Sequence, residues 1–381
     1  MKQEEKLKKW TEYTWNDVLT EAKNRIKYCL NKFDKIYVSF SWWKDSLVVL
    51  KLYEMVLDEL WRKDEKINVI FRDEELIPDY VIDFVKKQRE NPRYVFKWFA
   101  VPMRSNKFIL WKTIEYIQWN PNRKWIRPKP DFAITSDKIY DQYSMDALQC
   151  EWDKWRIWFM TWIRADESLV RLNSVLVKKD EPFIVTSSTP KAKLIKPIYD
   201  WKEVDVFKFF YDNNIEYSEI YDLQYWNKEA LRVSTPLRSE SAKEFNKIRT
   251  RTPVFYRQLL DIFPEMRIQE KYWKELDRFS IIWKYKPNPQ SLLEFINNEI
   301  DESLRQLAIK RAKSCLIARN NRLKQWYYKN LWWYPYYYIY KTLINWSFKR
   351  AVQAQINISK NDIEFEKDLY YKLNKNAGKK T

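Results

Sequence analysis

A short stretch near the N-terminus combines the residue types that bind phosphate. Residues 39–46 read SFSWWKDS; they follow a β-branched, aromatic run and precede a run with apolar residues at helical spacing. A lysine ammonium pairs with phosphate, serine hydroxyls donate hydrogen bonds to it, and the first turn of a helix offers free backbone N–H groups to an anion. We therefore expect a phosphate-binding loop, with Lys44, Asp45 and Ser46 as the candidate catalytic residues.

Two tryptophans, Trp42 and Trp43, lie in the middle of this stretch, where the backbone must turn sharply and touch the phosphates. Such a turn favours glycine, because glycine reaches positive φ without steric cost. The chain contains one glycine and 21 tryptophans, whereas glycine ordinarily makes up about 7% of residues. Glycine has therefore been removed from this chain. As written, the two indoles occupy the phosphate space, so we expect weakened phosphate binding.

The segments around this loop alternate between strand and helix patterns. Helices are expected at 44–60 and 78–91. Strands are expected at 35–40, 67–71, 94–101, 156–163 and 183–188. This alternation predicts an α/β fold, a Rossmann-like parallel sheet with helices on both faces, followed by a helical C-terminal region. Ligands of such sheets bind beyond the carboxyl ends of the strands, which is where the loop lies.

With glycine read at positions 42 and 43, the loop resembles the PP-loop of the adenine nucleotide α-hydrolase-like superfamily. The branch it resembles most is the phosphoadenosine phosphosulfate (PAPS) reductase family. Three further segments resemble motifs of this family in the family's order: VIFRDEELIPDYVIDFV at 69–85, TWIRADESLVR at 161–171 and KPIYDWKEVDVFKFF at 196–210. Trp162 again stands at a family glycine. Because three aligned tryptophans stand at family glycines, we interpret the composition as a wholesale replacement of glycine by tryptophan. The resemblance covers roughly residues 30–240.

The resemblance implies a set of nucleotide-binding residues. They are Ser39, Ser41, Trp42, Trp43, Lys44, Asp45, Ser46, Asp73, Arg164 and Arg171. In this set Asp73 would lie near the nucleoside, and Arg164 and Arg171 would be anion ligands. Each has a structural alternative: the loop as an ordinary strand-to-helix turn, Asp73 as a helix cap, and the two arginines as surface salt-bridge partners.

Departures from the family pattern bear on the reaction. Cys315 lies in KSCLIA, not in the Glu-Cys-Gly setting of the family's catalytic cysteine, and 229–240 lacks the paired cysteines that hold a cluster in adenylyl-sulfate reductases. We therefore expect neither PAPS reduction nor an iron–sulfur cluster, and with no histidine we expect no metal site built by the protein.

The nucleotide site that is left favours ATP pyrophosphatase chemistry on ATP or a PAPS-like nucleotide. An acceptor would attack the α-phosphate and Mg²⁺-bound pyrophosphate would leave, with catalysis mostly by positioning and electrostatics. Sulfur transfer and nucleic-acid modification are reactions of this type. The alternative is a non-catalytic nucleotide- or DNA-binding regulator that keeps the fold.

The net charge of +18 predicts an anionic partner. Residues 305–350 contain eleven Lys or Arg and no Asp or Glu, with an aromatic block at 326–340. This segment could bind nucleic acid through phosphate contacts and base stacking. Alternatively, it is a helical subdomain whose aromatic residues form a core and whose lysines are solvated.

The chain is expected to have four parts: a helical lead-in at 1–30, the nucleotide-binding domain at 31–252, the basic helical region at 253–358 and a polar tail at 359–381. No run approaches the roughly 18 apolar residues that span a bilayer, and the charged start MKQEEKLKKW is unlike a signal peptide. We expect a cytoplasmic protein without membrane contact. The resemblance also implies a phage or mobile-element context and a ParB/sulfiredoxin-like protein partner.

Overall fold

The computed structural model describes most of the chain, with gaps. The described residues are 15–110, 112–151, 157–167, 169–176, 181–187, 189, 191–229, 231, 235–273, 279–323, 334–355 and 358–371. In these ranges no helix is both long and apolar enough to cross a membrane. The chain divides into two compact units. The larger takes the described residues up to Lys107 together with Glu115–Met266, and the smaller takes Phe108–Ile114 and the described residues from Arg267 onward.

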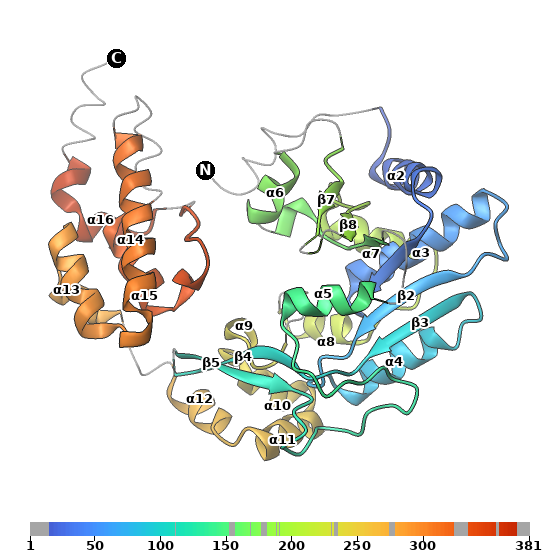
Figure 1. Cartoon of the computed structure of the whole chain (residues 1–381), viewed down its shortest axis with the longest axis horizontal. Coiled ribbons are helices and arrows are strands. Elements are labelled where there is room, and N and C mark those ends of the chain that lie inside the picture. The colour runs from blue at the N-terminus through green and yellow to red at the C-terminus, as the bar shows by residue number, and fades with distance from the viewer. Residues whose placement is uncertain are drawn as a thin grey trace. The chain divides into compact units, whose positions relative to one another are not determined.

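The larger unit is built on a six-stranded sheet in the order β3-β2-β1-β6-β8-β7 (Figure 1). The strands are β1 Ile36–Phe40, β2 Ile67–Arg72, β3 Tyr94–Phe99, β6 Ile157–Met160, β7 Ile184–Thr186 and β8 Ala192–Ile195. Five of them run parallel, and β7 pairs with β8 in the antiparallel sense. The predicted α/β fold with a mainly parallel sheet is confirmed, with β7 as an antiparallel edge.

Side chains of β1 alternate between two cores, one on each face of the sheet. Ile36, Val38 and Phe40 pack in one hydrophobic cluster, while Tyr37 packs in another. This alternation follows from the two-residue period of a strand. Because both faces are buried, β1 reads as a nearly continuous apolar run, as expected for a parallel strand covered by helices on both sides.

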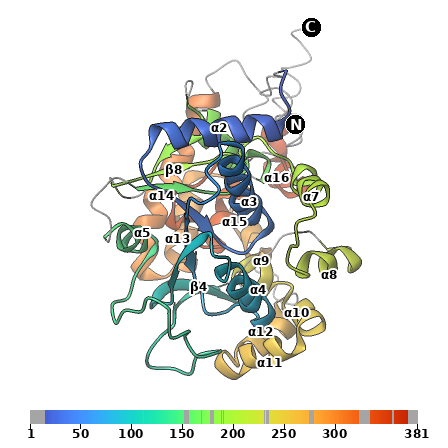
Figure 2. The same cartoon turned by 90° about the vertical axis from the view of Figure 1, so that its right-hand side faces the viewer.

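Helices cover the two faces unequally. The larger unit contains α2 Val18–Lys32, α3 Lys44–Glu59, α4 Asp79–Arg89, α5 Gln142–Cys150, α6 Leu169–Leu176, α7 Glu203–Asp212, α8 Ile220–Trp226, α9 Ser239–Ala242, α10 Phe245–Arg251 and α11 Pro253–Ile262. The cluster around Val38 includes residues of α2, α3, α4, α7 and α8, whereas the cluster around Tyr37 includes residues of α5. Figures 1 and 2 show α2 lying against α3 on the first of these faces.

The β3 edge of the sheet is partly covered by a loop. Ile134 donates its N–H to the Trp98 carbonyl (2.7 Å) and accepts from the Ala100 N–H (3.0 Å). A separate two-stranded sheet joins β4 Met103–Ile109 to β5 Lys112–Gln118.

The smaller unit is helical. Its helices are α13 Pro289–Glu299, α14 Glu302–Leu323, α15 Tyr336–Ile344 and α16 Lys360–Phe365, and α12 Met266–Tyr272 begins at the division between the units. Phe295, Tyr340 and Leu343 are fully or almost fully buried in its core. Arg319 pairs with Glu366 inside the unit at 2.8 Å, and that carboxylate also accepts the Tyr336 N–H at the start of α15.

Tryptophan occupies positions whose backbone suits glycine. Among the described residues, eight non-glycine residues have positive φ, and four of these are Trp42, Trp61, Trp119 and Trp346. For an L-residue this conformation costs about 1–2 kcal/mol. Finding the largest side chain at half of these positions supports the interpretation that tryptophan stands where glycine would fit.

Trp61 provides a clean stability test, because its side chain is 88% exposed and little burial is lost on truncation. It ends α3 at φ 60°, donating its N–H to Asp58 O while the Arg62 N–H reaches Leu57 O, the two hydrogen bonds of a Schellman motif. We predict that Trp61→Gly raises the free energy of unfolding by about 1 kcal/mol. Urea denaturation measures this change.

The matched control is Trp226→Gly, at the exposed last residue of α8, where the backbone is helical. There glycine should be neutral or destabilising by up to about 1 kcal/mol. Equal effects of the two substitutions would contradict the role of positive φ.

Candidate nucleotide-binding site

The SFSWWKDS loop connects β1 to α3 by a tight turn. Residue 42 has φ 62°, as the glycine interpretation requires, and residue 43 is extended with φ −72° and ψ 152°. Ser46, which is fully buried, accepts a hydrogen bond from the Ser41 N–H (3.1 Å) and donates one to the Trp43 carbonyl (2.8 Å). The Ser46 hydroxyl therefore holds the turn closed from inside.

A cavity of about 600 Å³ opens in front of this loop, within the larger unit. Ser39, Ser41, Trp42 and Trp43 line it. The other lining residues with polar side chains are Arg72, Glu74, Tyr80, Gln142, Asp146, Gln149, Thr161, Trp162, Arg171, Gln224, Thr235, Arg238, Ser241, Arg251 and Thr252. This volume lies in the usual range for small-molecule and cofactor sites.

The topology explains why the cavity is here. Residues 41–43 follow β1, Arg72 and Glu74 come at and after the end of β2, and residues 161–163 follow β6. Since β2, β1 and β6 are adjacent and parallel, their carboxyl ends meet at one edge of the sheet. The cavity thus has the position that ligand sites take in open α/β sheets.

Lys44 is turned away from the cavity. Its side chain is about 6% exposed, and Nζ donates to the Leu231 carbonyl at 2.7 Å and lies 3.2 Å from Glu203 Oε1. The Lys44 backbone N–H donates to the Tyr221 hydroxyl at 2.9 Å, and burial raises the pKa of that phenol. The Lys44 ammonium, which was predicted to meet a phosphate, is therefore held by Glu203 of α7 and by Leu231 after α8. The Lys44 backbone N–H is held by Tyr221 of α8.

Asp45 and Arg164 form a buried ion pair, with side chains that are each about 4% exposed and 2.8 Å between Oδ1 and Nε. The Arg164 guanidinium also binds both oxygens of Asp166, at 2.9 and 2.8 Å. Neither Asp45 nor Arg164 lines the cavity, whereas Arg171 does and pairs with Glu167. Of the two arginines predicted as anion ligands, only Arg171 faces the cavity.

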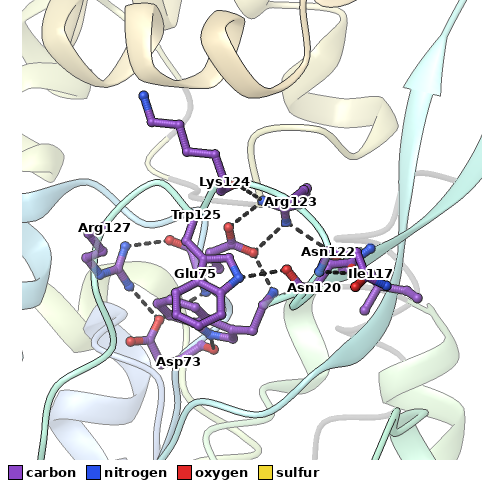
Figure 3. A network of polar contacts seen from close by, with 10 residues as sticks. Asp73, Glu75, Ile117, Asn120, Asn122, Arg123, Lys124, Trp125 and Arg127 are labelled. Carbon is purple, nitrogen blue, oxygen red and sulfur yellow. Dashed lines mark hydrogen bonds and ion pairs between the residues drawn. The ribbon is translucent and has the colours of Figure 1, made fainter. Parts of the chain in front are cut away.

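Asp73 belongs to a network of polar contacts with Glu75, Arg123 and Arg127 (Figure 3). It accepts hydrogen bonds from the Trp98 Nε1 (3.1 Å) and the Glu75 N–H (3.0 Å), and it pairs with Arg127. Burial is the main cause of its raised pKa, which the Arg127 charge opposes. Asp73 does not line the cavity, so the structure places it as a partner of the 120–127 loop.

The neighbouring Glu75 is fully buried in the same network and has φ 63°. Arg123 binds both of its carboxylate oxygens at 2.6 Å, as Figure 3 shows. The two arginines of the loop at 120–127 thus tie it to the turn after β2.

Sequence reasoning missed several groups at the cavity. Glu74 lines it and accepts a hydrogen bond from the Thr235 hydroxyl at 2.8 Å. Arg72 lines it and pairs with Asp146. The signal that was available is the strand-end position of Arg72 and Glu74, since the residues beyond a parallel strand face its ligand site. Tyr221, which is not among the cavity-lining residues but accepts the Lys44 N–H, carried no such signal.

The basic segment at 305–350 is partly a buried core. Arg319 forms a buried ion pair with Glu366. Part of the aromatic block is buried as well: its residues Tyr336, Tyr337 and Tyr340 are each less than 10% exposed. These tyrosines are thus not free to stack on bases. The side chain of Arg322 and residues 324–333, which include Lys324 and Lys329, lie outside the described residues.

Candidate metal ligands and cysteine thiols are the remaining groups with possible chemistry. In the described part of the chain, no group of three or more Asp, Glu, Cys or His residues is placed to hold a metal ion. Cys29, Cys150 and Cys315 are buried and unbridged. Burial raises the pKa of Cys315 to about 11, so this thiol is protonated at neutral pH.

The Asp45–Arg164 pair gives a testable stability difference. We predict that Arg164→Met lowers the free energy of unfolding by about 3 kcal/mol, because Asp45 is left as an unpaired buried charge. Adding Asp45→Asn should recover part of this loss, with a coupling energy of about 1–3 kcal/mol in the double-mutant cycle. Arg171→Met is the control, since its side chain is 33% exposed and its ion pair should contribute less than about 1 kcal/mol. Additive effects of the first two substitutions would contradict the buried pair.

Comparisons with known proteins identify the family of this chain. The chain is 29% identical over 227 residues to the uncharacterized protein YbdN of Escherichia coli strain K12, covering 55% of each chain. It is 25% identical over 266 residues to the uncharacterized protein MJ0973 of Methanocaldococcus jannaschii, covering 68% of this chain and 56% of that one. The chain therefore spans about half the length of the curated relatives it matches.

Among solved structures, FMN adenylyltransferase from Candida glabrata, in complex with FMN and an ATP analog, matches with a TM-score of 0.37 and 15% identity. The match covers 57% of this chain and 66% of that one. The family model of the phosphoadenosine phosphosulfate reductase domain matches residues 35–227, which contain the loop, the turn after β2 and the Arg164 segment. The chain belongs to the phosphoadenosine phosphosulfate reductase domain family.

Proposed function

We propose that this protein binds ATP, or a PAPS-like adenine nucleotide, in the cavity at the PP-loop and transfers its adenylyl group to an acceptor. The observation that carries the proposal is the loop itself. Ser39 and Ser41 line a cavity of about 600 Å³ beside a left-handed residue at the start of a 16-residue helix. Membership of the family supports the choice of an adenine nucleotide.

The loop has backbone groups that suit a phosphate. The N–H groups of Trp42 and Trp43 make no hydrogen bond with any described residue. Successive free N–H groups at a turn form a concave anion site, and the dipole of α3 adds positive potential there. The indoles oppose this fit, because Trp42 is 6% exposed and packs edge-on against Trp43 with ring centroids 6.0 Å apart.

In the proposed reaction Mg²⁺–ATP is the substrate. An acceptor oxygen forms a bond to the α-phosphorus, the bond from that phosphorus to the bridging oxygen breaks, and the electron pair leaves with Mg²⁺–pyrophosphate. The loop N–H groups stabilise charge on the phosphates, and Arg171 adds a cation at the cavity wall. Ser46 keeps the turn in shape. The Asp45–Arg164 pair fixes the loop after β6 against the start of α3.

Adenylyl transfer fits these residues better than reduction of PAPS. Reduction by the protein needs a thiolate nucleophile, and a thiol with a pKa near 11 such as Cys315 supplies very little of it at neutral pH. Nucleic acid and a ParB/sulfiredoxin-like protein are the further partners that we propose for the wider chain.

A second candidate function is a non-catalytic regulator that binds the nucleotide without turnover. The contacts of Lys44 favour it, because the ammonium is held by Glu203 and the Leu231 carbonyl instead of facing the cavity. Release of pyrophosphate from ATP separates the two functions, since a regulator binds ATP and releases none.

We predict that Trp42→Gly with Trp43→Gly strengthens ATP binding at least tenfold, about 1.4 kcal/mol. The reason is that the double substitution removes the indoles from the phosphate space and relieves positive φ at residue 42. Isothermal titration calorimetry measures the affinity, and a pyrophosphate-release assay on the same two proteins measures turnover. Trp226→Gly serves as the control for a general effect of removing tryptophan. An unchanged ATP affinity would contradict the steric argument.

Lys44→Ala, made in the Trp42→Gly, Trp43→Gly background, tests whether the ammonium moves to the phosphates when nucleotide binds. We expect ATP affinity or turnover to fall at least tenfold while the melting temperature of the nucleotide-free protein changes by only a few degrees. Lys51→Ala is the matched control, because Lys51 lies on the same helix and pairs with Glu54 away from the cavity. Lost stability with unchanged ATP binding would make Lys44 a structural residue.

A further inference from the structure

A second hollow adjoins the nucleotide cavity in the larger unit. Its volume is about 410 Å³, and it shares five lining residues with the cavity: Pro78, Tyr80, Arg251, Thr252 and Phe255. A transfer reaction needs its acceptor next to the nucleotide. The shared wall makes this hollow the natural place for the acceptor, an inference that rests on the proposed function.

Two groups in the shared wall can recognise a ligand. The Tyr80 hydroxyl is buried and makes no hydrogen bond to the described residues. Burial raises its pKa to about 12, so it is a neutral phenol and a hydrogen-bond donor at neutral pH. Leaving such a group unsatisfied costs about 1–3 kcal/mol. The charge of the nearby Arg251 guanidinium lowers the pKa of this phenol and so opposes the effect of burial. Arg251 Nη1 itself lies 3.3 Å from Glu229 Oε2.

The rest of the hollow combines apolar walls with polar groups at the rim. Leu223, Val254 and Phe255 give it apolar sides. Asp79 and Glu219 are exposed carboxylates at its edge, and the Gln258 amide both donates and accepts. A flat ring bearing both N–H donors and carbonyl or ring-nitrogen acceptors satisfies this set. Nucleobases have that chemistry.

The segment at 235–258, which runs from Thr235 at the nucleotide cavity to Gln258 at the hollow, carries excess positive charge. Residues 235–258 contain six Lys or Arg and two Asp or Glu. Arg238 and Arg257 are exposed, and neither has an ion-pair partner in the described part of the chain. Arg257 lies three residues after Val254 on α11, so the two residues share a face of that helix.

We propose that the second hollow receives an unpaired base of a single-stranded nucleic acid, whose backbone phosphates contact Arg238 and Arg257. The base is held by the Tyr80 hydroxyl and the apolar walls, beside the nucleotide cavity. Residues 235–258 lie beyond the family match at 35–227, whereas Tyr80 lies within it. The proposal places the nucleic-acid contact on α9 to α11 and not on the helices of the smaller unit.

The test uses a fluorescently labelled single-stranded RNA of 12 nucleotides without ATP, in anisotropy titrations from low to physiological salt. Arg238→Gln with Arg257→Gln should weaken binding at least fivefold and reduce the salt slope, because each lost phosphate contact lowers that slope by about 0.7 for single strands. Lys86→Gln with Lys208→Gln is the charge-matched control, on exposed lysines of α4 and α7. Lys310→Gln with Lys313→Gln tests α14 in the same way. The proposal is overturned if either comparison pair weakens RNA binding as much as the Arg238 and Arg257 substitutions do. It is also overturned if only the α14 substitutions weaken RNA binding.

The base itself is tested with Tyr80→Phe, which keeps the ring and removes the hydroxyl. It should weaken binding of the RNA at least threefold and leave binding of an abasic strand of the same length unchanged. Duplex RNA should bind more weakly than the single strand, and a free mononucleotide that binds equally well would instead indicate a small-molecule acceptor. ATP affinity is measured separately by calorimetry. Arg257→Gln alone separates the two proposals, because Arg257 does not line the nucleotide cavity, whereas Tyr80 and Arg238 do. Weaker RNA binding by this variant with unchanged ATP affinity supports the base site, and unchanged RNA binding contradicts it. Failure of the unsubstituted protein to bind ATP contradicts the proposed nucleotide function instead.

Discussion

The left-handed backbone at residue 42 is the constraint on which the proposed nucleotide site depends. It reverses the chain between β1 and α3, so that the loop residues Trp42 and Trp43 line the cavity at the sheet edge. Ser46 stabilises this turn through hydrogen bonds to both sides of it. With tryptophan at residue 42, the backbone geometry is kept at a steric cost, and the indole packs in the core cluster while lining the cavity. The shape of the turn is thus a property of its backbone, whereas the space left beside the turn for a ligand depends on the side chain at residue 42.

Buried charge organises the loops that surround this turn. Asp45 and Arg164 join the start of α3 to the loop after β6, and Asp73 and Arg127 join the end of β2 to the 120–127 loop. A charge that is removed from water needs a partner, and these loops supply one another's partners. The two arginines that were predicted as anion ligands therefore differ in their contacts. Arg164 holds protein together, whereas Arg171 lies at the cavity surface.

Much of the fold could be predicted from the sequence because its signals are local. The apolar run at 35–40 and the helical pattern after it correspond to β1 and α3. The antiparallel direction of β7 could not be predicted, since a strand's residues do not encode the direction in which it pairs. The pairing of β4 with β5 was also missed. Its strand Lys112–Gln118 alternates with exposed charged residues and has no apolar run.

The site was predictable only in part for the same reason. Ser39 and Ser41 line the cavity because they end the central strand, a position that the sequence pattern locates. Whether Asp73 or Glu74 faces the cavity depends on the conformation of three consecutive acidic residues, and Glu75 at positive φ rotates the backbone there. The partners of Lys44 come from residues about 160 to 190 positions later. Such contacts depend on tertiary packing, which no local pattern reports.

The two ends of the central sheet bear on how copies of this protein meet one another. An edge strand with a long row of unpaired N–H and C=O groups can recruit a strand from a second molecule and begin aggregation. Here β7 is only three residues long, and the outer side of β3 is bonded to Ile134. The β7 end is therefore short, and the β3 end is partly covered at Trp98 and Ala100. Both features disfavour self-association of copies through the sheet at high concentration.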